Sequence, residues 1–246
     1  MQKRGLSQEG LKLIACITML LDHIGAVTVM ACLENATGAN QGALLDLYEV
    51  LRLIGRLAFP IYCFLLAEGS AHTRNPKRYG LRLAVCAVIS ELPYDIALRG
   101  SFNWQHQNVM VTLFLGFCAL EVMKRSSKPV LKLLVSVPFM LLAEFAGGDY
   151  GAEGIMLVVL FALTGNMPRR NLAQLLGMWL IFSPGHAMFL NWLGGFSVTM
   201  QEWAVLAILP IALYDGRKVT KSKAVQWGFY LFYPVHLLAL YLIAMI

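Results

Sequence analysis

Charged residues are scarce in this sequence. Asp, Glu, Lys and Arg make up only 14% of its 246 residues, whereas a soluble domain usually carries about 25%. Hydrophobic residues make up 58%. This balance excludes an ordinary soluble globular protein and leaves no room for a separate soluble domain. We therefore expect a single domain over residues 1–246, most of it in contact with a lipid bilayer.

Several sequence motifs are missing as well. The five cysteines stand singly in apolar stretches and predict neither a disulfide nor a metal site. No internal repeat is present, and no GxSxG or activated-cysteine context indicates an acyl-enzyme. The first apolar run is too long for a signal peptide and lacks a cleavage site, so we interpret it as a retained helix. The net charge of +6 fits basic loops beside a membrane, not nucleic-acid binding.

Hydrophobic runs separated by polar loops predict an all-α polytopic membrane protein with about nine transmembrane helices. The sixth and eighth runs are short, which leaves eight spans as the alternative count. The expected spans cover residues 10–33, 52–72, 80–98, 107–123, 129–147, 151–166, 172–191, 200–215 and 225–246.

The basic residues predict the orientation of these spans. In the nine-helix arrangement, 17 of the 20 Lys and Arg residues fall on one side, which the positive-inside rule makes cytoplasmic. We therefore expect a cytoplasmic N-terminus and an extracytoplasmic C-terminus. An eight-helix arrangement would mix the charges between the two sides. The three exceptions are Arg52, Arg56 and Arg99, at the outer ends of their spans.

Ionisable residues inside the spans are the main functional signal, because a charge at membrane depth is costly and usually functional. Asp22, His23 and His236 fall near the middle of the first and last spans. Arg52 and Arg56 share one helix face and require an anionic partner, for which Asp22 is the candidate. Adjacent helical residues do not face each other, so His23 must find its own partner on another helix.

Other polar residues extend this pattern towards both surfaces. Glu68 and His72 fall in the inner half, followed by a basic loop. The outer half and outer surface carry Glu91, Tyr94, Asp95, Asn108, Glu144, Asp149 and His186. We interpret the pattern as a polar pathway from a basic cytoplasmic entrance, past a mid-membrane histidine, to an outer vestibule.

Each residue also has a purely structural explanation. His23 could be a satisfied interhelical hydrogen-bonder, and Asp22 could simply neutralise an arginine. His236 follows Pro234, which frees a backbone carbonyl one turn earlier. The histidines near the outer surface, among them His106, could simply be solvated. The basic loop could only set topology, or its side chains could converge on the phosphates of an anionic cofactor.

Several stretches resemble the TraX family of bacterial membrane proteins. They are LKLIACITMLLDHIGAV, LRLIGRLAFPIYCFLLAEGSAHTRNPKRYGLRL, ISELPYDIA, QNVMVTLFLGF and FYLFYPVHLLAL. The resemblance implies N-acetylation of the amino terminus of pilin in conjugation. It also places the chain among transmembrane acyltransferases that pass an acyl group from cytoplasmic acyl-CoA to acceptors across the bacterial cytoplasmic (inner) membrane.

One branch of that wider group carries a basic residue separated by ten residues from a helix-1 histidine, and a pair of arginines after helix 2. Lys12 and His23 match the first pattern here. Arg74 and Arg78 match the second with one additional residue between them. The nine expected spans are one fewer than the ten usual in that branch.

The pattern and the resemblance together predict a site with three parts. Acetyl-CoA, the expected donor, would be held by its phosphates at Lys12, Arg74, Lys77, Arg78 and Arg82. Its thin arm would follow about 16 Å of helix from Lys12 to His23. An acceptor amine, such as a pilin-like N-terminus, would contact Arg52, Arg56, Glu68, Glu91 and Asp95.

His23 is the expected general base, because the ordinary histidine pKa of about 6.5 lies near neutrality. Tyr233, Asn108 or a backbone N–H would hold the thioester oxyanion. Asp22 and His236 complete the catalytic candidates. Three alternatives stay open: a proton-coupled transporter, an intramembrane metal site built from His23, His236 and an acid, and a scaffold for pilus assembly.

Overall fold

The computed structural model describes residues 5–182, 200–220 and 222–245, and this part of the chain is helical with no β-strand. The first rod joins three segments end to end: α1 (Gln8–His23), the π-helical η1 (Ile24–Val29) and α2 (Met30–Glu34). Ser7 begins it by accepting a hydrogen bond from the backbone N–H of Gly10 at 3.1 Å, which satisfies one free donor of the first turn.

A second rod consists of α3 (Ala39–Gly55) and α4 (Ala58–His72). It breaks at residues 56–57 because Pro60 has no N–H to offer the carbonyl of Arg56 one turn earlier. The prediction that this span begins at residue 52 was wrong, since the helix begins at Ala39. Polar residues lower the hydropathy of this additional stretch, which nevertheless packs against α1 and η1.

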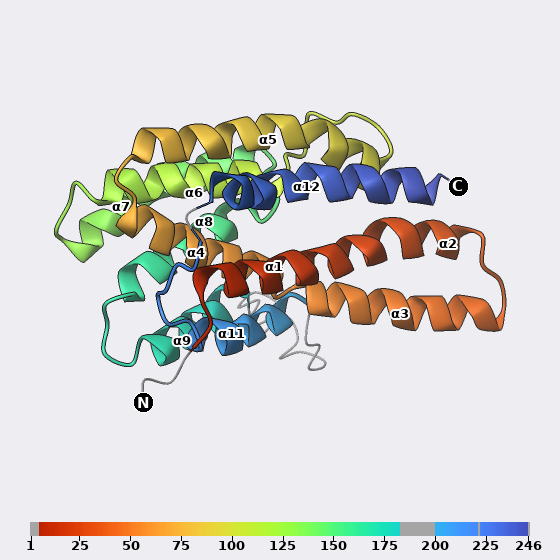
Figure 1. Cartoon of the computed structure of the whole chain (residues 1–246), viewed down its shortest axis with the longest axis horizontal. Coiled ribbons are helices and arrows are strands. Elements are labelled where there is room, and N and C mark those ends of the chain that lie inside the picture. The colour runs from red at the N-terminus through yellow and green to blue at the C-terminus, as the bar shows by residue number, and fades with distance from the viewer. Residues whose placement is uncertain (1–4, 183–199, 221, 246) are drawn as a thin grey trace, which may run out of the picture.

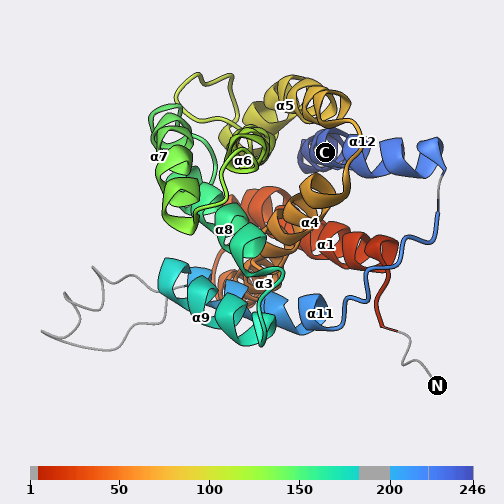
Figure 2. The same ribbon diagram turned by 90° about the vertical axis from the view of Figure 1, so that its left-hand side faces the viewer.

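The remaining helices complete the bundle. They are α5 (Pro76–Arg99), α6 (Val109–Met123), α7 (Pro129–Phe145), α8 (Gly151–Thr164), α9 (Arg170–Phe182), η2 (Met200–Ala207), α11 (Ile208–Ala212) and α12 (Lys223–Ala244). α4 packs against α1, α6 and α8, and α5 packs against α6 and α12. Viewed along its length, the bundle has α4 near its middle (Figure 2). Helices from both halves of the sequence therefore surround one interior.

Pro234 shows how a local sequence feature shapes this packing. It lies inside α12 and leaves the carbonyl of Tyr230 without its helical partner. The thiol of Cys86 on α5 donates to that carbonyl, with 3.3 Å between Sγ and O. The freed acceptor is thereby satisfied from the neighbouring helix, and α12 is tied to α5.

Three helical stretches in the described part of the chain are long and apolar enough to cross a membrane: Gln8–Glu34, Asn40–His72 and Lys223–Ala244. Shorter apolar helices cover Val109–Met123, Gly151–Thr164 and Met200–Ala212. The all-helical class predicted from the sequence is therefore confirmed. The count of nine spans stays a prediction, and residues 183–191 of the seventh expected span lie outside the described residues.

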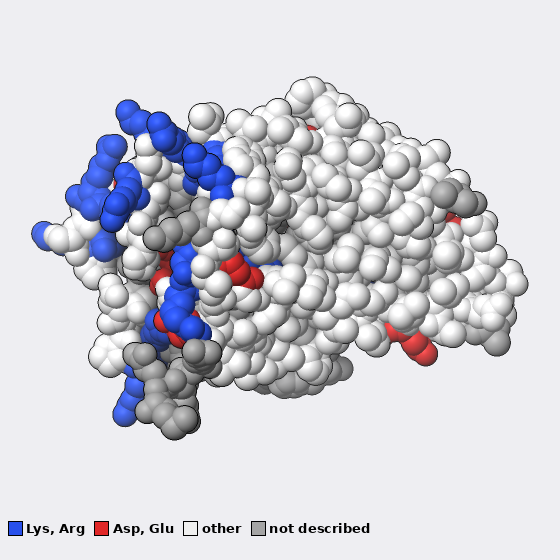
Figure 3. Space-filling view, viewed as in Figure 1, with Lys and Arg blue, Asp and Glu red and all other residues white. Residues whose placement is uncertain are grey.

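Charge is distributed unevenly along the bundle. On the face shown in Figure 3, Lys and Arg gather at one end. This is the end where α1 begins, whereas α12 ends at the opposite end (Figure 1). We call the first the basic end. This segregation is the pattern on which the predicted orientation depends, and the orientation itself stays a prediction. Lys3, Arg4 and Lys221 lie outside the described residues.

Candidate active site

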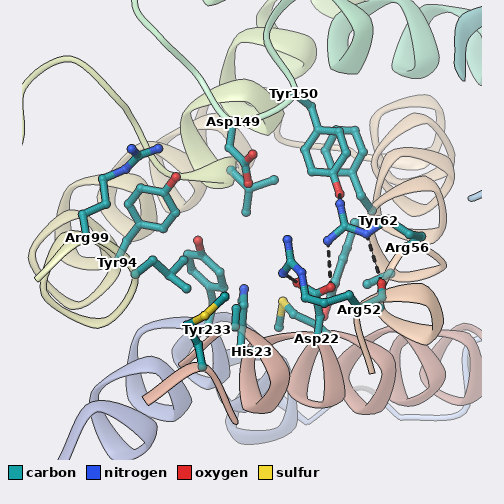
Figure 4. Close-up of a pocket in the computed structure, with 18 of the residues that line it drawn as sticks. Asp22, His23, Arg52, Arg56, Tyr62, Tyr94, Arg99, Asp149, Tyr150 and Tyr233 are labelled. Carbon is teal, nitrogen blue, oxygen red and sulfur yellow. Dashed lines mark hydrogen bonds and ion pairs between the residues drawn. The ribbon is translucent and has the colours of Figure 1, made fainter. Parts of the chain in front are cut away.

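A cavity of about 440 Å³ opens among α1, α3, α4, α5, α12 and the loop before α8. We call it the polar cavity, because eleven of its lining residues are charged, histidine or tyrosine: Asp22, His23, Tyr48, Arg52, Arg56, Tyr62, Tyr94, Arg99, Asp149, Tyr150 and Tyr233. Figure 4 shows Asp22, Arg52 and Arg56 grouped on one side, and Tyr94 and Arg99 on the other. His23 and Asp149 face each other across the space between these groups (Figure 4).

Asp22 joins Arg52 of α3 to Arg56, the residue directly after that helix. Its two carboxylate oxygens lie 2.5 Å from Arg52 Nη1 and 2.7 Å from Arg56 Nη2. Arg56 also donates to Tyr150 Oη at 3.4 Å and to Gln201 Oε1 at 3.1 Å. The i, i+4 spacing of the arginines puts both within reach of one carboxylate, so the partner suggested by the sequence is present. The group leaves one excess positive charge on this wall.

Gly55 makes this arrangement sterically possible. It lies between the two arginines on α3, and a Cβ atom at this position would overlap the Asp22 carboxyl group. Without a side chain at residue 55, the carboxylate can lie directly against the backbone of α3. The glycine therefore determines how closely the Asp22 carboxylate can approach the two arginines.

His23 takes its partner from the last helix. Its Nδ1 lies 2.6 Å from Nε2 of His236, and Nδ1 of His236 lies 2.6 Å from the carbonyl oxygen of Phe232. A carbonyl only accepts hydrogen bonds, so Nδ1 of His236 must carry a proton. The neutral ring of His236 then accepts at Nε2 from Nδ1–H of His23. This series of hydrogen bonds leaves the free lone pair of His23 on Nε2, on the side of the ring away from His236.

The backbone changes directly after His23. The π-helical segment η1 begins at the next residue, and single π-helical turns are frequent at functional sites. A second unusual backbone lies at Tyr150, where φ is +64°, a value that is rare for a residue with a side chain. Tyr150 stacks on Phe59 with ring centroids 3.7 Å apart. Such local strain persists only where the surroundings impose it.

Asp149 lies in the loop that faces His23. Its backbone N–H donates to the carbonyl of Gln107 at 2.9 Å, and its own carbonyl accepts from Thr112 Oγ1 at 2.5 Å. These bonds hold the backbone and leave the carboxyl directed into the cavity (Figure 4). Burial raises the pKa of the Asp149 carboxyl, against the opposing effect of Arg56. The cavity therefore has a carboxyl group opposite its candidate base.

A second, smaller cavity of about 110 Å³ continues from the polar cavity towards the basic end. We call it the inner cavity. Both are lined by Met19, Tyr62, Val109 and Tyr233, so the two spaces adjoin. The rest of the inner lining is mostly apolar, but Gln8 and Lys12 of the first turns of α1 belong to it. The two cavities thus connect the buried histidine with the beginning of α1.

Tyr233 stands where the cavities meet. Its ring centroid lies 6.1 Å from that of His23. Its side chain lines both cavities. A tyrosine hydroxyl can donate its hydrogen to an oxygen of a ligand. Tyr233 is therefore suited to hold a developing negative charge close to His23.

Most of the basic residues singled out in the sequence separate into two groups, one beside the inner cavity and one beside a groove on another face of α5. Nζ of Lys12 lies 5.3 Å from the centroid of the Phe229 ring, and Cζ of Arg82 lies 5.6 Å from the centroid of the Tyr79 ring. Tyr79 and Phe229 line the inner cavity, so these two cations stand beside it. Arg74 and Lys77 instead line a groove between α5 and α6. Arg78 is exposed and lines neither space.

Some predicted site residues lie away from both cavities. Asn108 caps α6 by accepting from Met110 N at 2.9 Å, and its amide donates to the carbonyl of Ala87 at 2.8 Å and to the Glu91 carboxylate. Asp95 accepts from Asn103 N at 2.9 Å. The structure therefore uses these three polar side chains to close the α5–α6 turn. They were singled out because depth alone does not reveal a local capping partner.

The other outlying candidates are placed as follows. Glu68 lies 3.8 Å from His72 Nδ1 on α4, and it lines neither cavity. His106 is exposed. His186 lies outside the described residues. Among the residues that the structure describes, no group of three or more His, Cys, Asp or Glu could hold a metal ion.

Three lining residues carried no sequence signal. Tyr48, Tyr62 and Tyr150 are single tyrosines on different elements, and only the tertiary fold turns them towards one cavity. Asp149 and Arg99 were visible as polar residues of the outer half but not as neighbours of His23. A sequence signal for these five would require knowing which helices pack together.

The fold and the site define a class, namely an all-helical protein with membrane-like helices and a buried cavity lined by His, Asp, Arg and Tyr. The chain matches the family described as "TraX protein" over residues 7–244, and it belongs to that family. The resemblance indicated by the sequence motifs is thereby confirmed.

Two curated proteins are similar to this chain. The "Probable fimbrial assembly protein FimC, serogroup H1" of Dichelobacter nodosus is 30% identical over 246 residues, which cover 92% of this chain and 91% of that protein. The "Uncharacterized protein RP591" of Rickettsia prowazekii (strain Madrid E) is 27% identical over 122 residues, which cover 48% of this chain and 38% of that protein. No solved structure matches the chain significantly.

Proposed function

We propose that this protein is a membrane acyltransferase that moves an acetyl group from cytoplasmic acetyl-CoA to an amine on the other side of the membrane. The observation that carries the proposal is the chain from Phe232 through His236 to His23, which leaves one imidazole lone pair free. The family and the fimbrial assembly relative favour a pilin-like N-terminus as the acceptor.

The two adjoining cavities support a route for the donor. The phosphates of acetyl-CoA bind near Lys12 and Arg82, and the thin pantetheine arm extends along the apolar inner cavity. The Nε nitrogen of Arg82 is buried without a hydrogen-bond partner among the described residues, so a donor group is available to a ligand. The thioester then reaches the junction of the cavities beside Tyr233.

The acceptor amine enters the polar cavity between Asp149 and His23. The Asp149 carboxylate attracts its ammonium form and takes the first proton, which leaves a neutral amine with a lone pair. His23 is in place to receive the second proton, which the amine loses during the attack. The lone pair of the amine attacks the thioester carbon, and His23 Nε2 takes the proton as the new C–N bond forms. The Tyr233 hydroxyl donates to the carbonyl oxygen while that oxygen carries negative charge.

The C–S bond then breaks as the carbonyl re-forms. The coenzyme A thiolate leaves and takes the proton from the His23 imidazolium, so the products are an amide and free coenzyme A. The proton therefore passes from amine to thiolate through one nitrogen. His236 acts only as a positioning residue, because it holds the His23 ring in the tautomer whose lone pair is at Nε2.

The test compares His23→Ala with His72→Ala in purified protein reconstituted in vesicles, with acetyl-CoA inside and a peptide amine outside. We expect loss of the general base to lower kcat by roughly 10²- to 10⁴-fold, the usual contribution of such a group. His72 is exposed on α4 and provides the control, with turnover close to that of the unaltered protein. Equal turnover in both variants would remove His23 from the reaction.

A further inference from the structure

Part of the basic cluster in the sequence is not explained by the donor route. On α5, Tyr79, Arg82 and Leu83 share the face that meets the inner cavity. Lys77, Leu81 and Ala84 lie on another face, at i, i+4 and i+7. This second face lines a groove of about 970 Å³ between the first turns of α5 and the last turns of α6. The helix separates the two spaces, so a ligand in the groove is distinct from one in the inner cavity.

The rim of the groove carries uncompensated positive charge. Arg74, Lys77 and Arg125 line it and are exposed, and none makes an ion pair with another part of the described chain. Glu121 also lines the groove, but its carboxylate is paired with Lys124 and accepts from Ser70 Oγ at 2.8 Å. The remaining charge of the rim matches a phosphate group, which arginine recognises well.

The floor of the groove is apolar. It includes Phe114, Phe117 and Val122 of α6. Phe117 is only 3% exposed. Its ring lies close against Gly80 of α5, since a Cβ atom added to that glycine would be only 3.1 Å from the ring. On the outer side, Leu81 is 64% exposed, as a residue that contacts hydrocarbon would be. The groove therefore offers cations at the surface of the basic end and an apolar surface below them.

We propose that this groove binds an anionic phospholipid of the leaflet at the basic end. Its phosphate lies among Arg74, Lys77 and Arg125, and one acyl chain lies along Phe114, Phe117 and Val122. Basic pockets between helices on one side of a membrane are known to hold such headgroups. The proposal does not depend on the acetyl transfer proposed above, since the groove shares no lining residue with either cavity.

The test uses the full-length protein in detergent, stripped of lipid. Native mass spectrometry counts bound phosphatidylglycerol, and thermal unfolding is followed with phosphatidylglycerol, phosphatidylcholine, inorganic phosphate or acetyl-CoA added. We expect phosphatidylglycerol alone among the two lipids to raise the midpoint of unfolding. The triple variant Arg74→Glu, Lys77→Glu, Arg125→Glu should lose both the bound lipid and this shift, while keeping its response to acetyl-CoA.

The control carries the same change of net charge elsewhere at the basic end, as Lys128→Glu, Lys132→Glu, Arg170→Glu, and should still bind the lipid. If the charge reversals prevent folding, Arg74→Gln, Lys77→Gln, Arg125→Gln serves instead with the same expectation. Retained phosphatidylglycerol in the groove variants would overturn the proposal. The proposal would also be overturned if the groove variants lost only their response to acetyl-CoA, because that would assign the groove to the donor. An equal shift of the unfolding midpoint with inorganic phosphate would overturn it as well.

Discussion

The polar and inner cavities adjoin but are built in opposite ways. The polar cavity has charged side chains in its wall, and its Asp22 is held by two arginines. The inner cavity is mainly aromatic and aliphatic, with cations only where it approaches the basic end. In the proposed reaction the thioester arm takes the narrow apolar path, and the amine acceptor takes the space with charged partners. The contrast between the cavities fits that division, with Tyr233 where they meet.

The largest expected effect comes from neutralising the charged wall of the polar cavity. Asp22→Asn leaves two largely buried guanidinium groups without their shared carboxylate. Removing one partner of a buried ion pair typically costs about 3–5 kcal/mol, so we expect a strong fall in the thermal unfolding midpoint in detergent. Asp46→Asn, on the exposed side of α3, is the matched control. Equal midpoints for the two variants would mean that the wall tolerates unpaired charge.

An intermediate effect is expected from the glycine that lets Asp22 approach α3. Gly55→Ala inserts a methyl group where the carboxyl lies, and overpacking of this kind costs about 1–3 kcal/mol. Gly42→Ala in the same helix is the control, because nothing lies within 4 Å of its new Cβ. Alanine is the better helix former, so this control should be neutral or slightly stabilising. The unfolding midpoints of the two variants should therefore move apart, and parallel shifts would refute the steric account.

The smallest effect is expected at the basic end of the inner cavity. Arg82→Gln removes a cation from the donor entrance while His23 and the polar cavity stay intact. The KM for acetyl-CoA should rise about tenfold with little change in kcat, the signature of lost ground-state binding. Arg170→Gln, which lines neither cavity, is the control. A fall in kcat with an unchanged KM would place Arg82 in the chemical step and break the division between the cavities.

Much of the fold was predictable because long apolar runs indicate membrane-like helices directly. Apolar runs long enough for helices, with charges between them, predicted helical segments close to those observed. The error at α3 has a physical cause: residues 39–51 mix Leu with Asn, Asp and Glu, and their helix is supported by packing on α1 and η1. Hydropathy measures transfer to lipid and is insensitive to that support.

For the site, the sequence was most informative where chemistry and spacing coincide. The cost of burying charge singled out Asp22 and His23. Helical periodicity placed Arg52 and Arg56 on one face and predicted separate partners for Asp22 and His23. Depth was a poorer guide. It grouped Glu91 and Asp95 with the cavity, although their partners are backbone and side-chain groups of the α5–α6 turn.

The sequence by itself determined the helical class, the basic end and the principal buried charges, since these follow from composition and local period. It also determined the family, because the stretches that resemble the family stand in the sequence. Only the tertiary structure decided that His236, more than two hundred positions along the chain, completes the hydrogen-bond chain of His23. It also brought Asp149 and the tyrosines to one cavity and divided the basic cluster between two faces of α5. These pairings depend on which helices lie side by side, and no local periodicity encodes that.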